Sequence, residues 1–217
     1  QYGGHTVAIG GNALNAMDTA GNNSVVIGAF AVEHSTSGCD YSVVIGSTAA
    51  QRFTGNQSVL IGAEVIGNTV TTGDRNVYLG YQAAYTDADG DNNVALGWRA
   101  MYSIDSGAHN NVVLGSNAAY AITDGADNVI LGYQAGYTGT NNLTTGRNNI
   151  LIGYRAEPTS ATISNEIAIG NTSHNHVRIP GIGCSISSGG AVISGVVTAT
   201  SFSGSGANLT GIGTQGP

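Results

Sequence analysis

A short apolar cassette recurs ten times along the chain and predicts its secondary structure. Each cassette has three apolar residues and then a glycine; the ten glycines are Gly10, Gly28, Gly46, Gly62, Gly80, Gly97, Gly115, Gly132, Gly153 and Gly170. Successive cassette glycines lie 16 to 21 residues apart. A unit that recurs at this scale is typical of a solenoid, in which every repeat forms one rung of a stack.

The alternation inside the cassette is that of a β-strand. Its first and third residues are always Val, Ile or Leu, whereas its middle residue varies among Ala, Val, Leu, Tyr and Ile. A constraint on every second residue indicates a strand with one tightly specified face. We therefore expect the first and third side chains to fill a narrow interior. The middle side chains then lie outside and are partly covered.

Small residues and asparagines recur at fixed places around the cassettes. Most repeats have alanine three residues after the glycine, at Ala13, Ala31, Ala49, Ala83, Ala100, Ala118, Ala135 and Ala156. A regular alanine predicts a second strand that crosses a narrow interior. Asparagine precedes most cassettes, at Asn23, Asn76, Asn93, Asn111, Asn128 and Asn149. Asparagine suits the turn before a strand, and stacked asparagines form hydrogen-bonded ladders.

These patterns predict an all-β fold, a repetitive parallel β-roll or β-solenoid of about ten two-stranded rungs. At about 4.8 Å per rung, the stack spans about 43 Å. We assign residues 1–183 to this repeat domain, which ends near Pro180, and residues 184–217 to a thin Gly/Ser/Thr-rich fibrous β segment with one strand at 191–199. So narrow a coil leaves apolar surface outside. Copies of the chain around an axis would cover that surface.

Composition narrows the range of partners. Glycine makes up 34 of 217 residues, only 9% of residues are charged, lysine is absent, and the formal net charge is −7. The negative charge excludes nucleic acid as a natural partner, because a phosphate backbone would be repelled. No apolar run reaches 18 residues, so we expect no membrane insertion.

The chain starts at Gln1 without Met, so we expect a processed chain or a piece of a longer one. Cys39 and Cys184 are expected to be isolated thiols.

Several segments resemble known fibrous proteins. Asn-Ser-Val-Val-Ile-Gly at 23–28 and Asn-Asn-Val-Val-Leu-Gly at 110–115 are similar to the head repeats of trimeric autotransporter adhesins. Leu-Gly-Tyr-Gln-Ala-Ala-Tyr at 79–85 and Leu-Gly-Tyr-Gln-Ala-Gly-Tyr at 131–137 resemble repeats of bacteriophage tail fibres, and 195–212 resembles segments of such fibre proteins. The resemblance implies a homotrimer of left-handed parallel β-rolls in a fibre or adhesin.

Two sets of aromatic residues recur at fixed positions after the glycine, and the first of them is a candidate ligand surface. The Tyr column, defined as Tyr85, Tyr102, Tyr120 and Tyr137, lies five residues after the glycine of four consecutive repeats. It is either structural stacking or a strip that binds sugar rings. The aromatic row, defined as Tyr81, Trp98, Tyr133 and Tyr154, directly follows the glycine and is interrupted once.

Two segments are candidate metal sites. Asp87, Asp89 and Asp91 alternate in a glycine-containing loop of the kind that suits Ca²⁺, although the closing glutamate of an EF-hand is missing. A plain solvated turn is the alternative. His174 and His176 lie on one side of an extended segment. By analogy with phage fibres, three such pairs around a threefold axis would bind a transition metal, and exposed turn histidines are the alternative. We expect no required cofactor.

The sequence favours a non-enzymatic protein. It has no nucleophile elbow, zinc-protease motif or phosphate-binding loop, and its few carboxylates fall mostly in turns. We expect an extracellular structural fibre or adhesin segment of a virion or cell-surface appendage that attaches to a bacterial surface, with host glycan as ligand. The alternatives are a purely structural shaft that self-assembles end to end and a cell-anchored adhesin head. An ice-binding solenoid is disfavoured, because no regular threonine array recurs.

Overall fold

The computed structural model describes residues 4–15, 22–35, 38–67, 70–105 and 107–173, together with the backbone of three later strands. The chain divides into two units, Gln1–Ser173 and His174–Pro217. The first unit contains all ten cassettes. No helix occurs in the residues that the structure describes, and consequently no helix there is long and apolar enough to cross a membrane.

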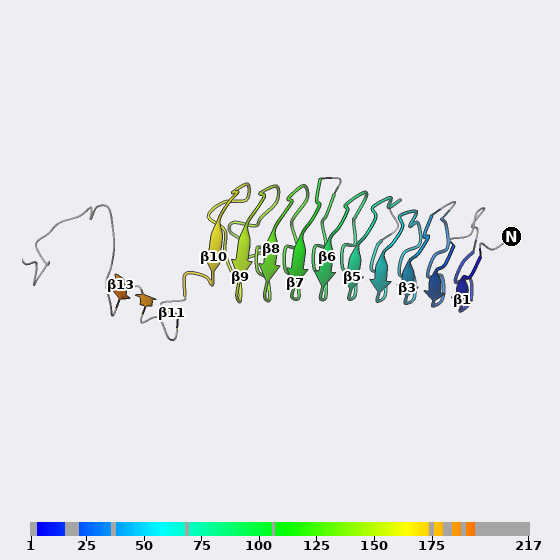
Figure 1. Cartoon of the computed structure of the whole chain (residues 1–217), viewed down its shortest axis with the longest axis horizontal. Helices are drawn as coiled ribbons and strands as arrows, with labels where there is room; N and C mark the ends of the chain where they lie inside the picture. The colour runs from blue at the N-terminus through cyan, green and yellow to red at the C-terminus, as the bar shows by residue number, and fades with distance from the viewer. Residues whose placement is uncertain are drawn as a thin grey trace, which may run out of the picture. The chain divides into compact units, whose positions relative to one another are not determined.

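Ten three-residue strands form the first unit, one at each cassette (Figure 1). They are β1 (Val7–Ile9), β2 (Val25–Ile27), β3 (Val43–Ile45), β4 (Val59–Ile61), β5 (Val77–Leu79), β6 (Val94–Leu96), β7 (Val112–Leu114), β8 (Val129–Leu131), β9 (Ile150–Ile152) and β10 (Ile167–Ile169). Neighbouring strands pair in parallel, in chain order and without slippage, so that equivalent cassette residues are aligned. The all-β solenoid predicted from the repeat is confirmed.

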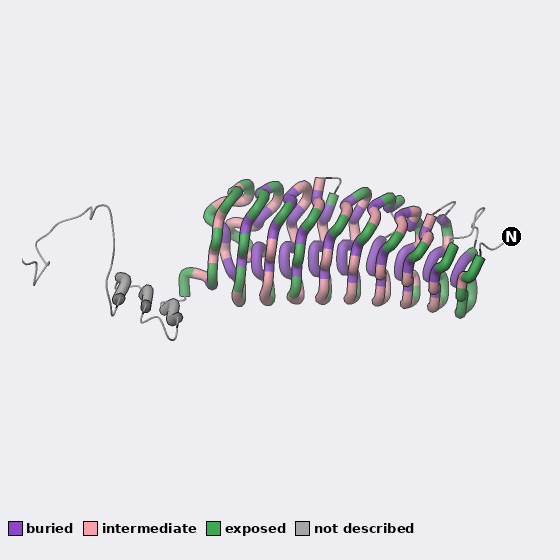
Figure 2. Tube along the Cα trace, viewed as in Figure 1, coloured by how far each residue is buried: buried purple, intermediate pink, exposed green. Residues whose placement is uncertain are grey.

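The orientation of the strands is the reverse of the one predicted. In β2 to β9 the middle residue points inward and is completely buried; these residues are Val26, Val44, Leu60, Tyr78, Ala95, Val113, Ile130 and Leu151. The first and third residues point outward and remain partly or largely exposed. The prediction failed because it assigned the more uniform face to the interior. A burial pattern that repeats from rung to rung is visible in Figure 2.

The second wall of each rung is irregular instead of a second strand. The described residues there form only isolated bridges, such as Leu14 with Val32 and Ala50 with Ile66. The residue two positions after the cassette glycine has positive φ in the rungs of β1 to β9, and the residue four positions after it does so in the rungs of β5 to β8, for example Gln82 at 54° and Ala84 at 57°. Left-handed residues interrupt the extended conformation that a strand requires. The alanine between them, Ala83 in this rung, is buried as expected for a narrow interior.

The cassette glycine permits the tight corner after each strand. Gly97 has φ of 141°, and a Cβ there would lie 2.6 Å from the carbonyl oxygen of Gly115 in the next rung. Both the backbone conformation and the close approach of successive rungs therefore require glycine. This explains the invariance of the fourth cassette position.

An internal hydrogen-bonded ladder runs along the stack at the residue before each cassette. Ser24, Ser42 and Ser58 begin it, and Asn76, Asn93, Asn111, Asn128 and Asn149 continue it. The side-chain oxygen of each member accepts a hydrogen bond from the backbone N–H of the next. The predicted asparagine ladder is confirmed from Asn76 onward. Asn23 lies outside it as an exposed residue with φ of 56°.

The second unit contains a small antiparallel sheet. Its strands are β11 (His176–Ile179), β12 (Cys184–Ser187) and β13 (Gly190–Ile193), paired in that order. The first of them precedes residue 184, where the sequence places the start of the C-terminal segment. Residues 194–199 of the expected strand lie outside the described residues.

Candidate binding surfaces of the solenoid

The outer apolar face is the largest uniform surface of the solenoid. We define it as the first and third residues of β1 to β10, twenty side chains that are all Val, Ile or Leu. Exposure reaches 39% for Leu114 in the middle of the stack and 69% for Ile167 at its end. With ten strands and three residues per strand, the footprint is about 43 Å by 10 Å. An apolar strip of this size, about 430 Å², is comparable to the largest patch on a typical soluble monomer, and such patches are often functional.

The two ends of the sheet are open along their hydrogen-bonding edges. The side chains of β1 are exposed throughout, including the inner residue Ala8. At the other end, Ile169 in β10 is 59% exposed. The described residues contain no further strand beside either edge. Such edges are templates for pairing with another chain.

The Tyr column lies along four consecutive rungs, as the spacing predicts. The ring centroids of Tyr85 and Tyr102 are 5.1 Å apart, and those of Tyr102 and Tyr120 are 4.7 Å apart with nearly parallel planes. Tyr120 and Tyr137 are also 4.7 Å apart but tilted by 31°. The tyrosines therefore cover one another's faces and are half-buried. A ligand would meet mainly their edges and hydroxyl groups, and the predicted sugar-binding role stays a prediction.

The aromatic row is more exposed than the Tyr column. Exposure is 40% for Tyr81, 45% for Trp98, 46% for Tyr133 and 57% for Tyr154. The rings of Tyr133 and Tyr154 stack with centroids 5.6 Å apart and planes 10° apart. Ser116 takes the place of an aromatic residue between Trp98 and Tyr133.

Arg99 connects the two aromatic sets. Its guanidinium carbon lies 4.6 Å from the Trp98 ring centroid and 5.4 Å from that of Tyr102. Its Nε donates a 2.8 Å hydrogen bond to the side-chain oxygen of Gln82, whose amide nitrogen donates to Glu64 at 2.7 Å. Cation–π contacts and this chain of polar groups hold the guanidinium against the surface.

The acidic loop separates its three carboxylates. Asp87 is completely buried, and its carboxylate accepts hydrogen bonds from the Tyr78 hydroxyl at 2.9 Å and from the Gly90 N–H at 2.9 Å. Burial raises the pKa of Asp87 to about 7, and nearby Asp89 and Asp91 add to the rise. Burial likewise raises the pKa of Tyr78. Asp87 thus pairs with an inner residue of β5, nine positions earlier in the chain.

The other candidate metal ligands do not join Asp87. Asp89 is exposed, and Asp91 accepts a hydrogen bond from the Asp74 N–H at 2.7 Å and forms an ion pair with Arg75 at 3.4 Å. Among the residues that the structure describes, no group of three His, Cys, Asp or Glu side chains could hold a metal ion. His174 and the side chain of His176 lie outside the described residues, so both metal sites stay predictions.

Cys39 lies inside the solenoid and is not a candidate nucleophile. Cys39 is a buried free thiol, and burial raises its pKa to about 11, which disfavours the reactive thiolate. The side chain of Cys184 is outside the described residues.

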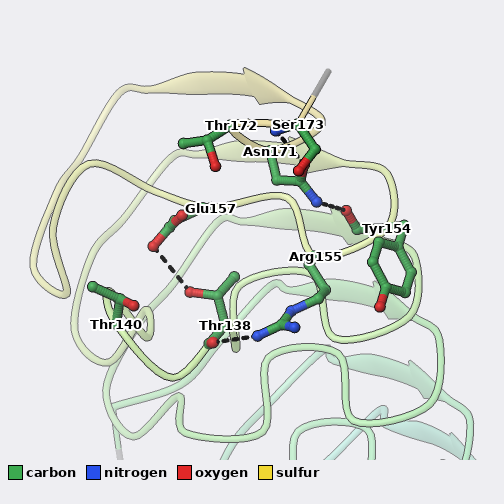
Figure 3. A pocket seen from close by; sticks show the side chains of 8 residues that line it. All are labelled: Thr138, Thr140, Tyr154, Arg155, Glu157, Asn171, Thr172 and Ser173. Atoms are coloured by element: carbon green, nitrogen blue, oxygen red, sulfur yellow. Dashed lines mark hydrogen bonds between the residues drawn. The ribbon is translucent and has the colours of Figure 1, made fainter. Parts of the chain in front are cut away.

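A pocket lies at the last rungs of the solenoid (Figure 3). Its volume is about 230 Å³, and it is lined by Thr138, Thr140, Tyr154, Arg155, Glu157, Asn171, Thr172 and Ser173. Arg155 donates to the Thr138 carbonyl at 2.7 Å, and Thr138 donates to Glu157 at 3.2 Å.

No protein-family model, curated protein or solved structure matches the chain. The function must therefore be argued from the surfaces themselves.

Sequence reasoning missed two features that the structure makes clear. It placed the outer apolar face inside, although the uniformity of the first and third cassette residues was visible. It also treated Asp87 as a loop ligand. The exceptional Tyr78, the only polar residue at the middle cassette position, was the available signal that one rung buries a polar partner.

Proposed function

We propose that the chain is an extracellular structural fibre or adhesin segment of a virion or cell-surface appendage, assembled as a homotrimer and attached to a bacterial surface. The observation that carries the proposal is the outer apolar face, which presents two Val, Ile or Leu side chains in each of ten rungs. Removing such a surface from water stabilises an assembly by about 25 cal/mol for each Å² covered. The proposal includes no catalytic step and no required cofactor.

A second copy of the chain is the occupant that best fits this face. A partner must provide a straight apolar surface about 43 Å long with the same spacing of about 4.8 Å. Another copy has both properties, so that copies around an axis would match rung for rung. Rotational symmetry then covers the outer apolar face of every copy equally, as is usual in homo-oligomers. The number three follows the resemblance to trimeric fibres.

A purely structural shaft is the second candidate, and the open sheet edges favour it. Exposed β1 and β10 have the same strand direction and the same apolar pattern. Stacking one copy on another would therefore continue the parallel sheet. In that case the chain lengthens a fibre and needs no ligand site of its own.

Charge placed on the outer apolar face tests the proposal. We expect the double substitution Leu96→Lys with Leu114→Lys to reduce the solution mass to that of one chain, because four-carbon ammonium side chains would disrupt the contact between copies. Asn92→Lys with Asn110→Lys is the matched control, since both asparagines are exposed and precede the same two strands by two residues. An unchanged mass in the Leu double variant would contradict lateral assembly through this face.

The attachment part of the proposal is tested by binding of the purified protein to bacterial surface polysaccharide. Retention above that of an unrelated protein of similar charge supports attachment. No retention, with the trimer intact, would favour the shaft. Addition of EDTA to the same samples tests the predicted Ca²⁺ or transition metal, because loss of mass would show that a metal supports the assembly.

A further inference from the structure

We infer that the one-rung gap in the aromatic row, between Trp98 and Tyr133, is a slot that binds a single pyranose ring of a glycan. The inference deepens the attachment part of the proposed function, on which it rests. It assigns the ligand to a different surface from the Tyr column.

The backbone fixes the order of the residues that form the slot. The Asn117 N–H donates to the Trp98 carbonyl at 2.8 Å, and the Gln134 N–H donates to the Ser116 carbonyl at 3.0 Å. Trp98, Ser116 and Tyr133 are therefore successive members of one column, one per rung. Serine leaves the middle rung without a ring.

The width of the gap matches one inserted ring. Trp98 and Tyr133 are two rungs apart, about 9.6 Å at the usual strand spacing. A ring midway between them would lie about 4.8 Å from each, within the range of about 4.5 to 7 Å for stacked rings. The neighbouring Tyr102 and Tyr120 show this spacing directly, with centroids 4.7 Å apart.

Both rings that border the gap are exposed. Tyr154 covers one face of the Tyr133 ring, yet Tyr133 remains 46% exposed. Trp98, at the other side of the slot, is 45% exposed although the Arg99 guanidinium lies over its ring. Within the described residues, Ser116 is the one small residue of this column that has aromatic neighbours in both adjacent rungs.

The groups around the gap favour a sugar over an aromatic side chain. A pyranose has apolar C–H faces and a rim of hydroxyl groups, so it needs flat apolar walls with polar groups at the edges. The rings of Trp98 and Tyr133 provide the walls. Ser116 at the base and half-buried Asn117 and Gln134 beside it provide hydroxyl and amide groups. An inserted aromatic side chain would leave these polar groups against carbon.

Trp98 is the single tryptophan of the chain and reports directly on the slot. The test titrates the intact protein with the methyl glycosides of glucose, galactose and N-acetylglucosamine while Trp98 fluorescence is recorded. A saturable change with at least one glycoside is expected. A Trp98 emission that is insensitive to acrylamide in the assembled protein would overturn the inference, since the slot would then be closed.

Two variants make the test specific. Ser116→Tyr completes the aromatic row, so it should weaken glycoside binding at least tenfold while leaving the melting temperature unchanged or higher. Tyr133→Ala removes one wall and should weaken binding similarly. Ser47→Tyr is the matched control, because it adds a ring at the same column position four rungs away, and binding should be unchanged.

The remaining outcomes separate this inference from the proposed function. No response to any glycoside, a response to N-acetyltyrosinamide alone, or full binding by Ser116→Tyr would overturn the sugar slot. If Ser116→Tyr still binds bacterial surface polysaccharide as well as the unmodified protein does, the slot is wrong but attachment stands. If the unmodified protein binds glycosides but not the polysaccharide, the slot stands and attachment to that surface fails.

Discussion

The inner and outer faces of the same strands differ in both residue variability and burial. The inner residue varies from Ala95 to Tyr78, yet it is completely buried in every strand from β2 to β9. The outer residues are restricted to Val, Ile and Leu, yet the chain leaves them partly exposed. Burial within the chain thus does not explain the uniform face.

Two neighbouring rungs show how the interior accommodates inner residues of different size. In the rung of β5, the hydrogen bond between Tyr78 and Asp87 shows that the inner strand residue faces the residue nine positions later. Tyr78, the largest inner residue, faces the short Asp87, whereas Ala95 has Ile104 at the equivalent position, and both are completely buried. Since close packing fixes the total volume, a large residue on one wall permits a small one opposite.

The outer apolar face has no partner within the chain that could compensate in this way. A uniform surface is expected where every rung meets an equivalent neighbour, and a parallel copy of the chain provides one. The comparison therefore predicts different consequences for inner and outer substitutions.

The largest difference is expected between Leu151→Ala and Ile152→Ala. Truncating the buried Leu151 leaves a cavity and should lower the free energy of unfolding by about 2 to 5 kcal/mol without changing the solution mass. Truncating the neighbouring outer Ile152 should act through assembly, so its melting temperature should fall on dilution. Thermal unfolding at several protein concentrations checks both. If both variants lost the same stability at every protein concentration, the inner and outer faces would not differ as proposed.

A smaller effect tests size compensation itself. Ala95→Ile should overpack its rung by about 1 to 3 kcal/mol. Ile104→Ala should leave a cavity that costs about 2 to 5 kcal/mol. The double variant should be more stable than the sum of the two losses predicts, by about 0.5 to 3 kcal/mol. Urea unfolding of the three variants measures this coupling, and strict additivity would show that the two walls do not compensate.

The third expected effect is a pH dependence of the buried Tyr78–Asp87 pair. The pKa of Asp87 is raised to about 7 in the folded chain and is about 3.9 when unfolded, so the folded state binds the extra proton between these values. Stability should therefore fall by up to about 1.4 kcal/mol for each pH unit across this window and level off above it. Asp87→Asn should remove this slope.

Urea unfolding from pH 4 to 8 measures the difference between the Asp87→Asn variant and the unmodified protein. The variant should gain relative stability as the pH rises. Parallel profiles would contradict the account of Asp87 as a buried carboxyl paired with Tyr78. Asp89→Asn is the control, since Asp89 is exposed and should leave most of the slope in place.

The stack of rungs could be predicted from the sequence, but the face of each strand that is buried could not. Gly97 and its equivalents recur in every rung, and the Asn76 to Asn149 ladder recurs in five consecutive rungs, so the repeat predicted these local constraints. Which face is buried depends on how the chain turns after each glycine. The left-handed conformations of residues such as Gln82 and Ala84 are not visible in an apolar pattern. The inward position of Asp87 was likewise hidden, because loop carboxylates are usually solvated.

The solution mass of the purified chain, measured by light scattering, tests the central claim most directly. The account predicts a mass near three times 21.8 kDa, because copies of the chain cover the outer apolar face. A stable, folded species of 21.8 kDa at all concentrations would contradict it, since the twenty outer side chains would then be exposed in the functional protein.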